Sequence, residues 1–209
     1  MLRLSVTDLE ALRYHKAIEG RSLDELLRNF ARMESPTRKM QAGKALASFF
    51  EHADEETLDS AVVDGWRFDF NLPEGTSLVV PPMREFKVEY PMMTPSGPVV
   101  LVGKVDGFHG LVVRDQKLTD KLEVEDRYTD SLQWRCYLAM LKAKKFVYDV
   151  FVGRISEHED TVTITEYHPI TFYTYPDIEA DVTRAVHELA EVVTRYQERI
   201  QALKEAAKV

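Results

Sequence analysis

The sequence has very little cysteine and no long apolar run. Its 209 residues include a single cysteine, Cys136, which excludes an internal disulfide and a multi-cysteine zinc or iron–sulfur site. No apolar stretch approaches the roughly 20 residues that a membrane-spanning helix needs, and charged side chains interrupt the first 20 residues every few positions. We therefore expect a cytoplasmic protein that is neither secreted nor anchored to a membrane.

An excess of basic residues is also lacking. The chain has 27 Lys and Arg residues against 35 Asp and Glu residues, which gives a net charge of −8. This balance argues against an indiscriminate binder of polyanions, although it is compatible with a local basic groove. The apolar fraction of 44% is typical of a globular chain, and the length predicts a single domain over residues 1–209.

The spacing of apolar residues predicts the order of the helices and strands. N-terminal helices are expected within 5–53, and short β-like runs separated by proline and glycine turns predict an antiparallel meander over 62–119. Helical spacing returns over 127–143, two strands follow within 145–173, and a last helix covers 177–207. This order predicts an α/β fold in which helices flank a central sheet.

Two local features of the N-terminal helices carry specific expectations. Ser5 or Thr7 can cap the first helix, with Glu10 as the capping-box partner of Thr7. Gly43 lies inside the third helix, where glycine costs about 1 kcal/mol relative to alanine. Its presence there predicts close packing or an approaching ligand.

The stretch "LVGKVDGFHGLVVRDQKLTD" reads as a β-hairpin that carries several charges. If its turn is centred on 109–110, Asp106 faces Val113 on the opposite strand. Side chains alternate between the two faces of a strand, so Val113, Asp115 and Lys117 share one face. Cross-strand pairing then puts Asp106 on the same face, diagonal to Asp115.

Two carboxylates this close raise each other's pKa unless a cation lies between them. Mg²⁺ binds oxygen ligands, commonly one or two carboxylates together with waters and substrate phosphates. Asp106 and Asp115 are therefore candidate metal ligands, and Lys117 is a candidate for orienting a metal-bound water or stabilising the charge it develops. The competing interpretation is a weak surface ion pair between Asp115 and Lys117, with Asp106 as an ordinary turn residue.

Three segments in this order, "GKVDG", "VVRDQKLTD" and "DSLQWRCYLAML", resemble the nuclease core of the PD-(D/E)xK superfamily. The resemblance is to its RecB-like and phage-exonuclease branch, in which G-x-x-D, D/E-x-K and Q-x-x-x-Y motifs follow one another. It implies a restriction-endonuclease-like core in which Asp106 and Asp115 bind metal and Lys117 helps to activate water. It also implies that Gln133 and Tyr137, which share one helix face, touch the active site or the nucleic-acid backbone. An ordinary half-buried helix is the alternative for these two.

The chain departs from this pattern at one position. Many relatives carry a histidine four residues after the glycine of the motif helix, and the corresponding count from Gly43 ends at Ala47. Glu51, one turn further on the same face, is the candidate third metal ligand. Gln41 is the alternative and His52 points elsewhere on the helix, while Glu51 also reads as the start of a solvated acidic stretch. The missing histidine leaves open a weakened metal site.

The resemblance implies a DNA exonuclease dependent on Mg²⁺ or Mn²⁺, which hydrolyses phosphodiester bonds in phage or bacterial recombination or repair. No iron–sulfur cluster is expected, because that subgroup uses four cysteines. DNA is the expected partner, with a recombination or helicase protein and a homo-oligomer as further candidates. The sequence has no G-x-x-x-x-G-K-[ST] motif of its own for unwinding. The alternatives are a catalytically weak nuclease fold that binds DNA or protein, and an unrelated α/β protein.

Other residues admit two interpretations each. Cys136 is expected to pack rather than react, His109 to lie in an exposed turn, and Trp66 and Trp134 to belong to the core rather than stack on bases. Basic residues near two helices could line a phosphate track, or could serve a helix C-terminus. They are Arg32, Arg38, Lys39, Lys44, Lys142, Lys144 and Lys145.

Overall fold

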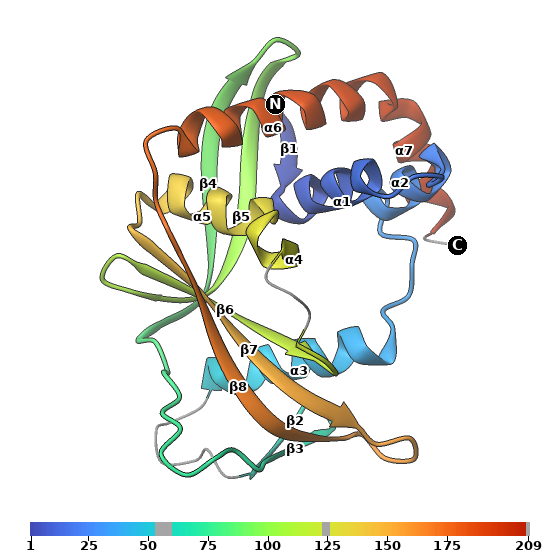
Figure 1. The fold of residues 1–209 in the computed structure, drawn as a ribbon. Coiled ribbons are helices and arrows are strands. Elements are labelled where there is room, and N and C mark those ends of the chain that lie inside the picture. Colours follow the sequence, from blue (N-terminus) through green and yellow to red (C-terminus); the bar gives the residue numbers. More distant parts are fainter. Residues whose placement is uncertain (53–59, 123–125, 208–209) are drawn as a thin grey trace.

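The computed structural model describes residues 1–52, 60–122 and 126–207. Its strands are β1 (Leu2–Ser5), β2 (Ser60–Val63), β3 (Trp66–Phe70), β4 (Met83–Thr94), β5 (Gly97–His109), β6 (Val112–Thr119), β7 (Lys145–Ile155) and β8 (Thr161–Tyr173). Its helices are α1 (Val6–Ala17), α2 (Leu23–Phe30), α3 (Arg38–His52), α4 (Asp126–Thr129), α5 (Leu132–Leu141), α6 (Ile178–Arg195) and α7 (Gln197–Ala206). The fold is mixed α/β, with a central sheet flanked by helices, as predicted (Figure 1).

The strands form one mixed sheet in the order β1-β5-β6-β7-β8-β3-β2, with β4 attached to β5. The pairs β1–β5, β6–β7 and β3–β8 are parallel. The predicted antiparallel meander over 62–119 is therefore only partly right, because β3 pairs with β8 and not with β4. Within this range, the segment 77–82 forms no strand. Its two prolines have no backbone N–H to donate to a ladder.

Helices cover both faces of the sheet, and β7 shows the alternation. Phe146 and Tyr148 point into the core that packs against α1, α5 and α6. Phe151 points to the opposite face, where its ring stacks on that of Phe50 from α3 at 5.2 Å. In Figure 1, α3 lies apart from the other long helices, on the far side of the twisted strands.

Two predicted helices are each split in the structure. The helix expected over 127–143 is divided at Ser131, whose side chain accepts a hydrogen bond from the backbone N–H of Gln133 and caps α5. Such local hydrogen bonding by serine favours a new helix start over continuation of the old helix. The helix expected over 177–207 is divided at Tyr196, where φ is −112° and ψ is 19°.

No helix in the described ranges is both long and apolar enough to cross a membrane.

The N-terminus differs from the prediction in two ways. Residues 2–5 form a strand parallel to β5 before α1 begins, and four residues are too few for their alternation to be recognised. Ser5 caps α1 with Asp8 as its capping-box partner, through N–H···O bonds of 3.0 and 3.1 Å. The predicted Thr7–Glu10 box is thus wrong, and the Glu10 carboxylate is available to residues far away in the chain.

The β5–β6 hairpin turns one residue later than predicted. Gly107 pairs with Arg114 and His109 with Val112, and Gly110 occupies the turn with φ +62°. The register is shifted by two residues from the predicted one, since Gly107 was expected opposite Val112. A shift of two preserves the face on which each side chain lies, whereas a shift of one would reverse it.

Strand β5 changes neighbours along its length. It pairs with β1 through Val99–Val102 and with β6 only from Gly107 onward. Between these stretches, 103–105 pairs with β4 alone, and the described register gives Asp106 no partner. Asp106 lies in this gap.

Candidate metal and nuclease site

Side chains take the place of strand neighbours in the gap beside β5. The backbone N–H of Gln116 on β6 donates to Oδ2 of Asp106 at 3.3 Å. The hydroxyl of Tyr137 on α5 donates to the backbone carbonyl of Lys104 at 2.5 Å. Gly103 makes this second contact feasible, because a Cβ atom there would overlap Cε1 of the Tyr137 ring. In the gap, the Gln116 N–H and the Tyr137 hydroxyl therefore supply the hydrogen bonds that a neighbouring strand would otherwise supply.

Asp115 is fixed from two sides. It is 3% exposed, and its Oδ1 accepts a hydrogen bond of 2.5 Å from Nε2 of Gln133 on α5. The Nζ atom of Lys117 lies 2.5 Å from Oδ2 of Asp115 in an ion pair, and 35% of the Lys117 side chain is exposed. Among the described residues, Oδ2 receives no hydrogen bond of ordinary geometry. This buried oxygen retains capacity for a further ligand.

The electrostatics of the site favour a cation. Burial, together with the charge of Asp115, raises the pKa of Asp106 to about 7. Burial acts to lower the pKa of Lys117, but the carboxylates of Asp115 and Asp106 outweigh it and the pKa is raised. Two carboxylates thus face one ammonium group, and additional positive charge would offset their repulsion.

The donor set suits Mg²⁺ or Mn²⁺. Both carboxylates offer oxygen atoms, which these ions prefer, and one or two protein carboxylates are the usual complement for Mg²⁺. No group of three His, Cys, Asp or Glu residues able to hold a metal occurs within the described parts of the chain. The residues that fit such an ion are therefore Asp106 and Asp115.

Glu51 is not brought to these carboxylates. Helix α3 packs on the sheet face that carries Leu118, whose Cβ lies 4.0 Å from the Cβ position of Gly43. Lys117 points to the opposite face, as alternation along a strand requires. The backbone carbonyl of Glu51 instead accepts a hydrogen bond of 3.0 Å from Arg84.

The two alternatives weighed beside Glu51 also have local partners. The side chain of Gln41 donates to the Pro36 carbonyl at 3.4 Å. The ring of His52 lies 2.9 Å from the carbonyl of Ser48, one turn back in the same helix.

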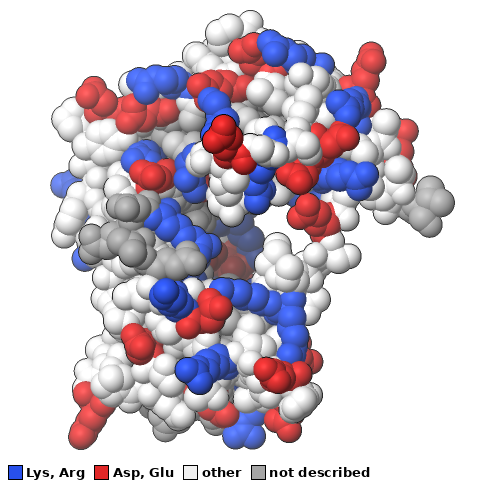
Figure 2. Space-filling view, turned by 45° about the vertical axis from the view of Figure 1, so that its right-hand side comes forward, with Lys and Arg blue, Asp and Glu red and all other residues white. Residues whose placement is uncertain are grey.

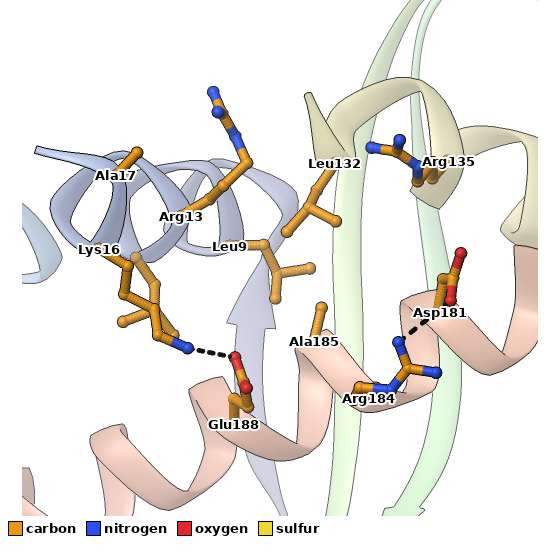
Figure 3. Close-up of a pocket in the computed structure, with 11 residues that line it drawn as sticks. Leu9, Arg13, Lys16, Ala17, Leu132, Arg135, Asp181, Arg184, Ala185 and Glu188 are labelled. Atoms are coloured by element: carbon orange, nitrogen blue, oxygen red, sulfur yellow. Dashed lines mark hydrogen bonds and ion pairs between the residues drawn. The ribbon is translucent and has the colours of Figure 1, made fainter. Parts of the chain in front are cut away.

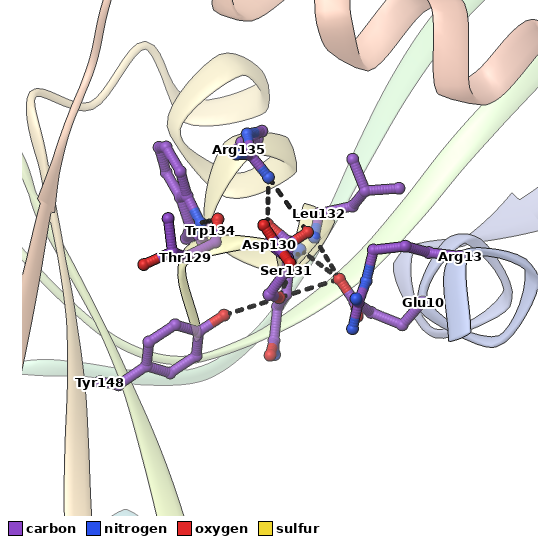
Figure 4. A network of polar contacts seen from close by, with 10 residues as sticks. Glu10, Arg13, Thr129, Asp130, Ser131, Leu132, Trp134, Arg135 and Tyr148 are labelled. Atoms are coloured by element: carbon purple, nitrogen blue, oxygen red, sulfur yellow. Dashed lines mark hydrogen bonds and ion pairs between the residues drawn. The ribbon is translucent and has the colours of Figure 1, made fainter. Parts of the chain in front are cut away.

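A polar network behind the site was not foreseen from the sequence (Figure 4). Oε1 of Glu10 accepts hydrogen bonds from the Ser131 hydroxyl at 2.8 Å, from the backbone N–H of Gln133 at 2.8 Å and from that of Leu132. Oε2 of Glu10 accepts from Arg13 at 3.0 Å. The Ser131 hydroxyl also lies 2.9 Å from the Tyr148 hydroxyl. A carboxylate from α1 thereby caps α5, the helix that presents Gln133 and Tyr137.

The residues with two interpretations are now located. Cys136 is fully buried and burial raises the pKa of its thiol. Trp66 and Trp134 are 6% and 5% exposed, and the Trp134 ring stacks on Phe172 at 4.8 Å. Both indoles therefore belong to the core. His109 is exposed at the end of β5.

Basic side chains border a hollow across the middle of the molecule (Figure 2). In that view acidic and basic side chains both lie inside the hollow, and further lysine and arginine side chains lie along its margins. Part of the predicted basic track is neutralised by carboxylates: Arg32 pairs with Asp8, Arg38 with Asp160, Lys39 with Asp120 and Lys142 with Glu179.

Comparison with known proteins identifies the fold but no sequence family. No family model matches the sequence, and no curated protein matches it. The solved structure of SSO0001 superposes with a TM-score of 0.52 at 12% identity, covering 92% of this chain and 77% of that chain. LHK-Exo in complex with dAMP superposes with a TM-score of 0.50 at 11% identity, covering 98% of this chain and 93% of that chain. At these identities the likeness shows the fold alone.

Proposed function

We propose that this chain is a nuclease that depends on Mg²⁺ or Mn²⁺ and hydrolyses phosphodiester bonds in DNA from strand ends. The observation that carries the proposal is the convergence of Asp106, Asp115 and Lys117 at the gap beside β5, with Gln133 hydrogen-bonded to Asp115. The nuclease-like fold and the structural likeness to LHK-Exo, an exonuclease, support it.

Each residue has a separate task in this proposal. Asp106 and Asp115 would hold the metal, which supplies Lewis-acid stabilisation of the scissile phosphate and lowers the pKa of its bound water. The Lys117 ammonium group orients the attacking water and stabilises negative charge that develops during attack. Gln133 fixes the rotamer of Asp115, and Tyr137 fixes the β5 backbone next to Asp106. In the reaction, the water oxygen bonds to phosphorus, the bond to the leaving sugar oxygen breaks, and that oxygen gains a proton.

The setting of the activity is proposed on the resemblance to RecB-like and phage exonucleases. The nuclease would act in recombination or repair of DNA in a phage or a bacterium. A helicase or recombination protein would be its partner, and a homo-oligomer would be its active form. Cytoplasmic location follows from this setting and belongs to the same proposal.

The test is degradation of end-labelled linear DNA and of closed circular DNA with Mg²⁺, with Mn²⁺ and with chelator. We expect loss of linear DNA only, with both metals, and none with chelator. Lys117→Ala should lower the rate at least about a hundredfold. Lys204→Ala, at an exposed position of α7, is the matched control and should retain full activity. Cleavage that persists in Lys117→Ala, or in chelator, would contradict the proposed site.

A second candidate function is a binding module that retains a nuclease-like fold without efficient hydrolysis. Two observations favour it: the described residues contain no three-member metal-ligand group, and Lys117 is already paired with Asp115. A folded protein that binds linear DNA but degrades none with either metal would establish this alternative.

A further inference from the structure

A cavity of about 530 Å³ lies between α1, α5 and α6, separate from the paired carboxylates (Figure 3). Its size is within the range of small-molecule sites in proteins. Its apolar wall is formed by Leu9, Leu12, Leu132 and Ala185. Figure 3 shows Leu9 and Leu132 facing each other across the space, with Ala185 below them.

The charged rim of the cavity has two neutral pairs and two further cations. Lys16 pairs with Glu188 at 2.8 Å, and Arg184 pairs with Asp181 at 3.2 Å. The remaining lining cations are Arg13 and Arg135.

Of these two arginines, Arg13 has a carboxylate partner, whereas Arg135 has none among the described residues. Arg13 pairs with Oε2 of Glu10, whose other oxygen is occupied by the N-terminus of α5. Arg135 donates to the backbone carbonyls of Ser131 at 2.8 Å and Asp130 at 3.2 Å. Its guanidinium lies 4.5 Å from the centre of the Trp134 ring, and within the described ranges it forms no ion pair with a carboxylate.

We propose that this cavity binds a nucleoside monophosphate or a phosphate monoester of the same chemistry, in which an anionic head is joined to a flat apolar body. Arginine recognises phosphate through paired N–H donors, so Arg135 and Arg13 would contact the phosphate. The leucine and alanine wall would pack against the base, for which a cavity of this volume has room. This site does not rest on the proposed nuclease activity. Leu132 connects the two regions, since it lines the cavity and is next to Gln133, which holds Asp115.

The experiment is calorimetric titration of the intact chain with AMP, adenosine and inorganic phosphate in the presence of chelator. Chelator removes metal-dependent phosphate binding at Asp106 and Asp115. Because the phosphate and the adenosine part of AMP would both contact the cavity, we expect AMP to bind at least about tenfold more tightly than adenosine or inorganic phosphate alone. Competition by a 5′-phosphorylated oligonucleotide, compared with free AMP, distinguishes a strand end from a free nucleotide as the source of the monoester. Recognition of either one supports the proposal.

Two variants test the cavity by different means. Arg135→Gln removes charge and should weaken AMP about tenfold or more. Ala185→Phe fills the apolar space without changing charge and should abolish binding, and circular dichroism would verify its fold. Arg154→Gln, an exposed arginine of β7, is the matched control and should bind AMP as the unaltered chain does.

Three outcomes would overturn the proposal. One is the absence of AMP binding by the folded protein. Another is equal binding by Arg135→Gln and the unaltered chain. The last is loss of binding in Lys117→Ala with retention in Arg135→Gln, which would assign the ligand to the region around Lys117. Because the titration measures binding without turnover, its result is independent of whether the chain degrades DNA.

Discussion

Glu10 accepts a hydrogen bond from the backbone N–H of Gln133 at 2.8 Å, across 123 positions of the chain. The same carboxylate oxygen also binds the Ser131 hydroxyl. It satisfies N–H groups at the start of α5 that the helix itself leaves without partners, and its charge suits the positive end of the helix dipole. The side chain that fixes Asp115 therefore projects from a helix that is anchored by α1.

Replacement of Glu10 should loosen this anchor. Glu10→Ala is expected to lower the free energy of unfolding by about 2 kcal/mol, because it removes a cap and leaves buried donors without an acceptor. Urea denaturation measures the change. Glu10→Gln retains one acceptor oxygen and should lose less than half as much. Equal losses in the two variants would show that the cap is not the stabilising contact.

Enlargement of Gly103 should displace Tyr137. A Cβ at this position overlaps the Tyr137 ring, so Gly103→Ala is expected to cost about 2 kcal/mol of stability and to break the bond from Tyr137 to the Lys104 carbonyl. The double variant Gly103→Ala/Tyr137→Leu removes the clash and should be more stable than Gly103→Ala with Tyr137 intact. If Gly103→Ala alone melts like the unaltered protein, the close approach is not a constraint.

Gly43 should tolerate the same substitution. The structure leaves ordinary contact space there, with Leu118 Cβ at 4.0 Å. Gly43→Ala is therefore expected to stabilise α3 by about 0.5 to 1 kcal/mol, the gain in helix propensity. Thermal denaturation tests this directly. A destabilised variant would mean that close packing explains the glycine, and a stabilised variant with impaired DNA cleavage would mean that a substrate approaches it.

The paired carboxylates predict a distinct dependence of stability on pH in chelator. The pKa of Asp106 is raised from 3.8 to about 7 in the folded protein. Between these values the folded state holds a proton that the unfolded state releases, so the free energy of unfolding should fall as pH rises from about 4 to about 7. Asp106→Asn should remove this fall and be more stable than the unaltered chain at pH 8, by about 2 kcal/mol.

At pH 8, added Mg²⁺ should make the unaltered chain more stable than Asp106→Asn. The metal competes with the proton for the carboxylates and binds only the folded state. Asp64→Asn, in a turn at φ 52° that asparagine tolerates, is the matched control. If Asp106→Asn gains as much stability from Mg²⁺ as the unaltered chain, Asp106 is not a ligand.

The spacing of apolar residues was sufficient to predict the helix-flanked sheet. The alternation of side chains along a strand was sufficient to predict the grouping of Asp106, Asp115 and Lys117. The grouping survived an error of two residues in the hairpin register, because the two faces of a strand alternate with a period of two. The functional roles of these residues, and those of Gln133 and Tyr137, stay predictions.

The features that sequence reasoning missed depend on distant contacts. Ser5–Asp8 and Thr7–Glu10 have identical spacing, so the capping-box pattern alone could not choose between them. The choice determines whether Glu10 acts within α1 or at α5. Likewise, the helical wheel relates Glu51 to Gly43, but only the packing of α3 on the Leu118 side of the sheet determines which face Glu51 can reach.

The stretch of β5 that lacks a second strand neighbour has a consequence for the order in which this protein can be completed during synthesis. Its Lys104 carbonyl is served by Tyr137, and Asp115 is held by Gln133, more than ten residues downstream of the last carboxylate. A nascent chain that ends between β6 and α5 would contain both acids without the two side chains that fix them. A ribosome-bound fragment of that length would therefore present its carboxylates to solvent, and only emergence of α5 would bring them into their buried arrangement.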